Sequence, residues 1–132
     1  MGYLKKVYAI YPFNDCGEIA GVYIGSTLNI KERMAQHLFS PKNEVGKQGQ
    51  MHELMIRNGY KVQIIDVIHD YWGEANREYD WIDFCEKNTD LKIFNTRMGK
   101  TYEPNHKRIA FHLESESVQP VFVNGEILWR IK

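Results

Sequence analysis

The alternation of strand-like and helix-like segments is the feature that most restricts how this chain folds. Short β-branched and aromatic runs are typical of strands, whereas apolar residues spaced four apart indicate amphipathic helices. Strands are predicted at residues 6–11, 21–26, 62–68 and 91–95. Helices are predicted at about residues 29–39, 50–58 and 73–88. This order predicts an α/β (α+β) fold, with a small mixed central sheet flanked by about three helices.

Two loops and a hairpin complete this outline. A modest loop joins the first two strands, so we expect them to pair antiparallel. Residues 43–49 are polar and contain glycine, which predicts a second loop. Residues 118–123 and 126–131 flank the dipeptide Asn124-Gly125, which is the signature of a β-hairpin. We therefore predict a core at residues 1–99 and a C-terminal extension at residues 100–132 that packs on the same domain.

Composition excludes several classes of protein. The 132 residues suffice for one domain with its own core, and the two cysteines, Cys16 and Cys85, lack the paired spacing of a zinc site. No apolar run approaches the roughly 20 residues of a membrane span, and the first residues lack the apolar core of a signal peptide. We therefore expect a cytoplasmic protein with no membrane partner. Basic and acidic residues balance at 17 each, which argues against a domain that grips long nucleic acids by charge alone.

Helical spacing places three polar side chains at or within apolar faces. Arg33 and His37 lie one turn apart on the first predicted helix and flank Ile30, at the edge of its apolar stripe. Glu78 falls within the apolar arc of the third predicted helix, where an unpaired carboxylate is costly. Two explanations stay open at this point: a structural ion pair between Arg33 and Glu78, or a functional site that uses both.

The order of these residues resembles the GIY-YIG nuclease family. Residues 22–27 read Val-Tyr-Ile-Gly-Ser-Thr and contain the Tyr-Ile-Gly of the second motif literally. The first motif is relaxed, because Lys6-Val7-Tyr8 stands where the family often has Gly-Ile-Tyr. The remaining matches are Arg33 ten residues after Tyr23, His37 one turn later, Glu78 ahead of Trp81-Ile82, and Asn95 after the following strand. The resemblance covers about residues 6–99.

This resemblance implies hydrolysis of phosphodiester bonds with one divalent metal ion, magnesium or manganese. Glu78 would be the single carboxylate ligand, and water and phosphate oxygens would complete the shell, as magnesium favours. Tyr8 would be the general base. A free tyrosine has a pKa of about 10, so Tyr8 would need a nearby cation or metal-linked water to act as a phenolate. Arg33 would bind the scissile phosphate, because a guanidinium group matches phosphate bidentately.

The other matched residues take supporting roles under the same resemblance. His37 and Tyr23 would orient the nucleophile or the phosphate, and Asn95 would hold geometry rather than do chemistry. Gly25 would let the backbone or the substrate approach closely. The expected contacts with nucleic acid come from Arg33, Lys6, Lys100, Lys107 and Arg108.

Each match also has a plain structural explanation. Tyr8 and Tyr23 are ordinary strand residues by type, and Gly25 could simply end a strand. His52 and His69 are interpreted as ordinary surface or half-buried histidines and receive no role.

We therefore interpret the chain as a metal-dependent endonuclease that cuts DNA through a GIY-YIG-type site. The alternative is a domain of the same fold whose cleavage is weak or lost and which binds nucleic acid or another partner. The relaxed first motif and the zero net charge keep this alternative open. We expect structure-selective or nonspecific cutting unless the chain forms a homodimer.

Overall fold

The computed structural model describes residues 4–39, 46–69, 77–95 and 105, together with the strands at 118–123 and 126–131. The main sheet has four strands in the order β3-β1-β2-β4, and the last two strands form a separate two-stranded sheet. The elements are β1 (Leu4–Pro12), β2 (Gly21–Thr27), α1 (Ile30–Phe39), α2 (Gly46–Asn58), β3 (Tyr60–His69), α3 (Arg77–Asn88), β4 (Lys92–Ile93), β5 (Val118–Val123) and β6 (Glu126–Ile131).

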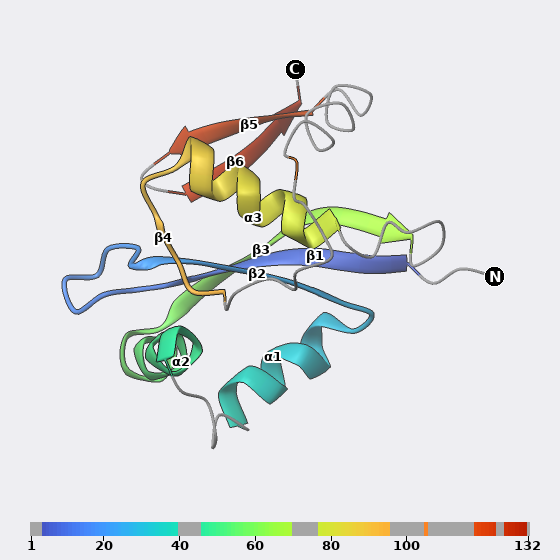
Figure 1. Cartoon of the computed structure of the whole chain (residues 1–132). Helices are drawn as coiled ribbons and strands as arrows, with labels where there is room; N and C mark the ends of the chain where they lie inside the picture. The colour runs from blue at the N-terminus through green and yellow to red at the C-terminus, as the bar shows by residue number, and fades with distance from the viewer. Residues whose placement is uncertain are drawn as a thin grey trace.

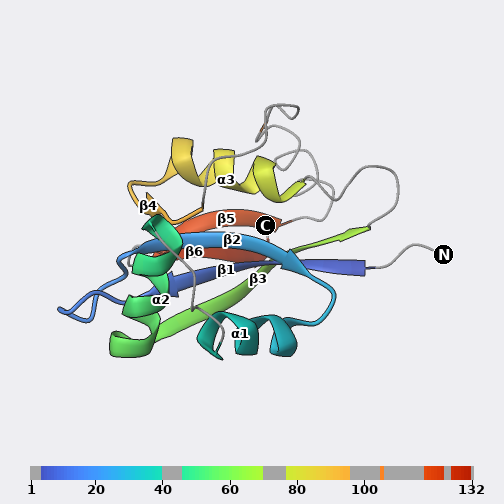
Figure 2. The same ribbon diagram turned by 60° about the horizontal axis from the view of Figure 1, so that its bottom comes forward.

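The main sheet is mixed and has helices on both faces. β1 pairs antiparallel with β2 and with β3, whereas β4 runs parallel to β2. Figures 1 and 2 show α1 and α2 on one side of this sheet and α3 on the other. The predicted fold class is confirmed. Among the described helices, none is long and apolar enough to cross a membrane.

Strand alternation divides the core between the two faces of the sheet. Val7, Ala9 and Tyr11 of β1 belong to the cluster that packs against α3 and contains Trp81. Tyr8, the residue between Val7 and Ala9, belongs to the other cluster, which packs against α1 and α2. Successive side chains of a strand point to opposite faces, so Tyr8 is directed toward the side of the sheet that α1 covers.

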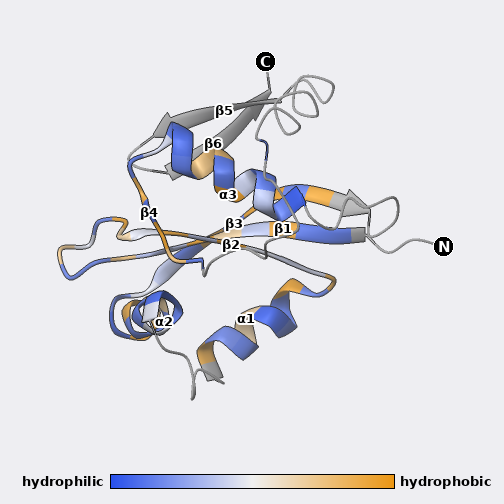
Figure 3. Ribbon diagram, viewed as in Figure 1, coloured by the Kyte–Doolittle hydropathy of each residue, from blue (hydrophilic) through white to orange (hydrophobic). Residues whose placement is uncertain are grey.

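Helix α1 has the amphipathic character that its sequence predicts. Ile30, Met34 and Leu38 pack against the cluster that contains Tyr8. Asn29 caps the helix, since its Oδ1 accepts a hydrogen bond from the backbone N–H of Glu32 at 3.2 Å. Figure 3 shows that much of the ribbon of α1 is coloured as hydrophilic. This orientation turns the neighbouring edge of the helix, with Arg33 and His37, toward β1 and β2.

A buried ion pair ties the start of α3 to β3. Arg77 donates from Nε to Asp66 Oδ2 at 2.7 Å and from Nη2 to Asp66 Oδ1 at 2.9 Å. The indole N–H of Trp81 donates to the same carboxylate at 2.9 Å. Glu78 follows Arg77 directly, so this clamp fixes the first turn of α3 from which Glu78 projects.

The prediction of a loop at residues 43–49 is wrong for residues 46–49, because α2 begins at Gly46. Gly46 takes φ 65°, and the lysine and glutamines that follow it are good helix formers. Burial of Met51 and Met55 on the same helix outweighs the cost of Gly49, since tertiary packing supplies most helix stability in proteins. Residues 40–45 lie outside the described part of the chain.

Other boundaries differ by a few residues. β1 and β3 extend beyond their predicted ends, and β1 includes Pro12 as its last residue. The strand predicted at 91–95 is limited to two residues. The predicted start of the third helix at residue 73 lies outside the described residues. The two strands of the hairpin are confirmed, whereas its turn at residues 124–125 is not described, and the packing of the C-terminal extension on the core stays a prediction.

Candidate active site

Tyr8 is the centre of a group of polar side chains between the sheet and α1. Its hydroxyl lies 3.0 Å from His37 Nε2 and accepts a hydrogen bond from Arg33 Nε at 3.3 Å. The side chain of Tyr8 is fully buried, with 0% of its surface exposed. The i, i+4 spacing of Arg33 and His37 on α1 brings both side chains to the same hydroxyl group.

Tyr23 and His37 pack beside Tyr8. The ring centroids of Tyr23 and His37 are 5.3 Å apart in an edge-to-face arrangement, and those of Tyr8 and Tyr23 are 6.4 Å apart. Such tilted aromatic pairs are favourable and restrict ring orientation. The structure therefore brings together four of the predicted residues: Tyr8, Tyr23, Arg33 and His37.

Gly25 is required by the position of Tyr8. The two residues lie opposite each other in the register of β1 and β2. A Cβ atom added at Gly25 would lie 2.5 Å from Cζ of Tyr8 and closer still to its hydroxyl oxygen. Only glycine leaves room for the phenol ring to lie across β2. The group that approaches Gly25 closely in this structure is therefore the side chain of Tyr8.

The environment keeps Tyr8 protonated and His37 neutral at pH 7. Burial raises the pKa of Tyr8 to about 12, helped by the charges of Tyr23 and Glu78 and opposed by the hydrogen bond and charge of Arg33. Burial also lowers the pKa of His37 to about 4, and the charge of Arg33 adds to this effect. For Arg33 itself, burial lowers the pKa, but the interactions with Tyr8 and Tyr23 outweigh it and raise the pKa.

Glu78 reaches the end of β2 from the other face of the sheet. Its Oε2 accepts a hydrogen bond from Ser26 Oγ at 2.5 Å. The ion pair with Arg33 that the sequence left open is not formed in the described part of the chain, where Arg33 contacts Tyr8 and Gln36 instead. The charge of Glu78 still raises the pKa of Tyr8, so the carboxylate and the phenol lie within electrostatic reach of each other.

The donor set around Glu78 fits a hard divalent cation that keeps most of its water. No cluster of three or more His, Cys, Asp or Glu side chains suited to a metal occurs among the described residues. Glu78 is half-buried and uses one carboxylate oxygen for Ser26, which leaves the other oxygen for a ligand. Magnesium is commonly held by one or two carboxylates plus water and substrate phosphate, so a single acid is compatible with it.

Asn95 supports β2 next to the site. Its Oδ1 accepts from the backbone N–H of Ile24 at 2.9 Å, and its Nδ2 donates to the Ile24 carbonyl at 2.7 Å. This pair of bonds takes the place of a further β-ladder step beyond β4 and holds the backbone immediately before Gly25.

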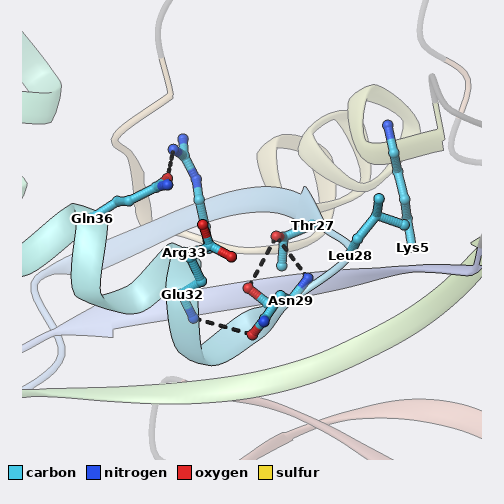
Figure 4. A pocket seen from close by; sticks show the side chains of 7 residues that line it. All are labelled: Lys5, Thr27, Leu28, Asn29, Glu32, Arg33 and Gln36. Carbon is cyan, nitrogen blue, oxygen red and sulfur yellow. Dashed lines mark hydrogen bonds between the residues drawn. The ribbon is translucent and has the colours of Figure 1, made fainter.

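An open pocket of about 310 Å³ lies beside Arg33 at the start of α1. Figure 4 shows the side chains that line it, among them Arg33 from α1 and Lys5 from β1, whose cationic ends point toward the same side. Arg33 Nη1 donates to Gln36 Oε1 at 3.0 Å, an exposed contact on the same helix. Arg33 and Lys5 outnumber the one carboxylate of the lining, that of Glu32, so the pocket carries a net positive charge that attracts a phosphate group.

The predicted nucleic-acid contacts separate into two groups. Lys6 is exposed and shares the face of β1 that carries Tyr8, in line with the alternation of the strand. Lys100, Lys107 and Arg108 lie outside the described residues, so their contribution stays a prediction.

The interpretation of His52 as a surface or half-buried histidine is wrong. His52 is buried on α2, with 4% of its surface exposed, and its Nε2 lies 3.1 Å from His37 Nδ1. Its sequence position carried a signal, because His52 lies between Met51 and Met55 on the apolar side of the helix. The contact itself depends on how α1 and α2 pack, which spacing along the chain does not reveal.

Comparison with known proteins gives a family. The model of the GIY-YIG catalytic domain matches residues 5–90, a stretch that includes Tyr8, Tyr23, Arg33, His37 and Glu78 but not Asn95. Comparisons with curated proteins and with solved structures gave no match. Domains of this family are nuclease domains that act on nucleic acid. Because the match covers more than half of the chain and the fold agrees with it, this chain belongs to the GIY-YIG family.

Proposed function

We propose that this chain is a metal-dependent endonuclease that hydrolyses phosphodiester bonds in DNA. The observation that carries this proposal is the contact of Tyr8 with both Arg33 and His37. The charge of Glu78 also raises the pKa of the same phenol. A base, a phosphate-binding cation and a metal-binding carboxylate are the groups that phosphodiester hydrolysis needs.

Each residue has a distinct task in this proposal. Arg33 binds the scissile phosphate with its planar guanidinium group and neutralises charge that develops in the transition state. Tyr8 releases its own proton to solvent once its hydroxyl is uncovered, and then accepts a proton from the attacking water. Glu78 would hold a magnesium or manganese ion, which when bound supplies Lewis-acid stabilisation of the phosphate.

Activation of Tyr8 requires a change in its surroundings. Its hydroxyl is buried beneath the side chain of Arg33, and its pKa of about 12 keeps it protonated at pH 7. Movement of Arg33 onto a bound phosphate uncovers the hydroxyl for water. It also withdraws a group that lowers the pKa of Tyr8, so a metal ion held by Glu78 would have to supply the charge that favours the phenolate. Two hydrogen bonds hold Arg33 in place, one to Tyr8 and an exposed one to Gln36, and a bidentate pair with a phosphate of opposite charge is stronger than either.

The burial of Tyr8 also favours a second candidate function. A domain whose phenol never reaches water would bind nucleic acid without cleaving it, and the relaxed Lys6-Val7-Tyr8 motif agrees with this reading. The intact set of Tyr8, Tyr23, Arg33, His37 and Glu78 favours the enzyme, because a binding module has no use for an acid beside a phosphate site.

The direct experiment compares cleavage of single-stranded, duplex and branched DNA, and of RNA, with magnesium, manganese or a chelator. Glu78→Gln keeps the shape of the side chain but removes the charge that the metal needs, so we expect turnover to fall to background with an unchanged fold. Glu86→Gln is the matched control, since Glu86 is exposed on the same helix.

We expect Glu86→Gln to cleave as the wild type does. Full activity of Glu78→Gln in magnesium would remove the metal-binding role of Glu78. Binding of nucleic acid without cleavage by the wild type under every metal would favour the second candidate function.

A further inference from the structure

Three buried side chains form a continuous hydrogen-bonded chain from β1 to α2. Tyr8 Oη lies 3.0 Å from His37 Nε2, and His37 Nδ1 lies 3.1 Å from His52 Nε2. All three residues are buried, and only 5% of the surface of His37 is exposed. The imidazole rings of His37 and His52 have centroids 5.4 Å apart. Both ring nitrogens of His37 are therefore engaged, one by Tyr8 and the other by His52.

The chemistry of the donors favours one direction for this chain. Within the described part of the chain, the hydroxyl of Tyr8 contacts His37 and Arg33, and a guanidinium group can only donate. A neutral, buried phenol must therefore give its own proton to Nε2 of His37. A neutral imidazole that accepts at Nε2 carries its proton at Nδ1, and that proton points to Nε2 of His52.

We propose that His52 is a positioning residue of the active site, which accepts the Nδ1–H of His37 and so holds His37 in the tautomer whose Nε2 faces Tyr8. Without this acceptor, His37 could move its proton to Nε2 and would then compete with Arg33 as a donor to Tyr8. His52 acts through His37 and does not touch the reacting atoms. The inference rests on the proposed function of Tyr8.

The packing of α2 supports this role. Met51 and Met55, on either side of His52, are buried in the same cluster as Tyr8, so α2 holds His52 at a fixed distance from α1. The pKa of His37, which burial lowers to about 4, keeps its ring neutral at pH 7, as this direction of hydrogen bonding requires. Orientation of a histidine by a third group through its other nitrogen recurs in catalytic sites.

The test uses two substitutions at one position. His52→Gln keeps an acceptor, because the amide oxygen of glutamine reaches about as far as Nε2 of histidine, whereas His52→Leu removes it. The first measurement is the nitrogen-15 spectrum of the His37 ring in substrate-free protein, which reports the nitrogen that carries the proton. We expect Nδ1 protonation in the wild type and in His52→Gln, and a shift toward Nε2 protonation in His52→Leu.

The second measurement is the steady-state rate of cleavage. We expect kcat to fall about 10–100-fold in His52→Leu with KM unchanged, and His52→Gln to restore it to within a few-fold of the wild type. An unchanged His37 tautomer and kcat in His52→Leu would overturn the proposal. So would Nε2 protonation of His37 in the wild type, a measurement that needs no variant to fold. If the wild type cleaves nothing, the proposed function fails, but the spectrum still decides the role of His52.

Discussion

At the scale of single residues, Tyr8 connects three elements through one hydroxyl group. It lies on β1, across from Gly25 on β2, and contacts Arg33 and His37 on α1. The sequence could predict that Arg33 and His37 contact a common partner, because i, i+4 spacing places them on one side of a helix. It could not predict that the ring of Tyr8 would be fully buried beneath Arg33.

Arg33→Lys separates charge from shape at this position. Lysine keeps the positive charge but loses the planar fork that pairs with phosphate, so we expect kcat/KM to fall about 100-fold or more. The measurement is cleavage of labelled DNA in magnesium. Arg57→Lys serves as the control, because Arg57 forms exposed ion pairs with Asp15 and Glu53 away from Tyr8. A near-normal rate for Arg33→Lys would show that Arg33 is only a structural partner of Tyr8.

At the scale of elements, the clamp between β3 and α3 decides where Glu78 lies. The carboxylate of Asp66 accepts from both Arg77 and Trp81, and the Asp66 and Arg77 side chains are largely buried. Removal of one partner from a buried pair leaves an uncompensated charge, which is much more costly than loss of an exposed pair.

Asp66→Asn therefore tests the clamp. We expect the free energy of unfolding to fall by about 2–4 kcal/mol, measured by urea denaturation. Asp15→Asn is the control, because Asp15 pairs with Arg57 at the surface, and its unfolding midpoint should match that of the wild type. Equal midpoints for Asp66→Asn and the wild type would mean that the clamp does not hold α3 in place.

The elements show where sequence reasoning reaches its limit. The helix at Ile30–Phe39 was predictable because a cap, an apolar stripe and a following proline agree. The first turn of α2 was not, since the glycines and polar residues there indicate a loop, and the burial of Met51 and Met55 against the sheet outweighs that signal. For the same reason, the contact between His37 and His52 follows from helix packing rather than from spacing along the chain.

At the scale of the whole molecule, the balance of charge would limit how strongly one copy binds nucleic acid. The 17 basic and 17 acidic residues cancel, so the local cations near the site must supply the attraction. Arg33 and Lys5 line the pocket, and Lys6 is exposed nearby on β1. A homodimer is our proposal for how so neutral a domain would enlarge its binding surface.

Salt dependence measures this directly. The slope of log K against log salt is about −0.9 per phosphate neutralised on duplex DNA, so two to four contacts predict a slope of about −2 to −4. We expect weak binding with a shallow slope at low protein concentration. The measurement is fluorescence anisotropy over about 50 to 300 mM salt, a range in which the screening length changes appreciably. A slope that steepens as protein concentration rises would support the dimer. Tight binding by a monomer with a steep slope would contradict this account.

The central claim is that the hydroxyl of Tyr8 takes part in chemistry rather than in binding, and Tyr8→Phe tests it most directly. Tyr11→Phe is the matched control, because Tyr11 lies on the same strand, is equally buried and bonds Gln63 on the other face of the sheet. We expect Tyr8→Phe to lose about 10²–10⁴-fold in kcat while the Kd for DNA stays within a few-fold of the wild type, and Tyr11→Phe to keep its rate. Wild-type cleavage by Tyr8→Phe in magnesium would contradict the account.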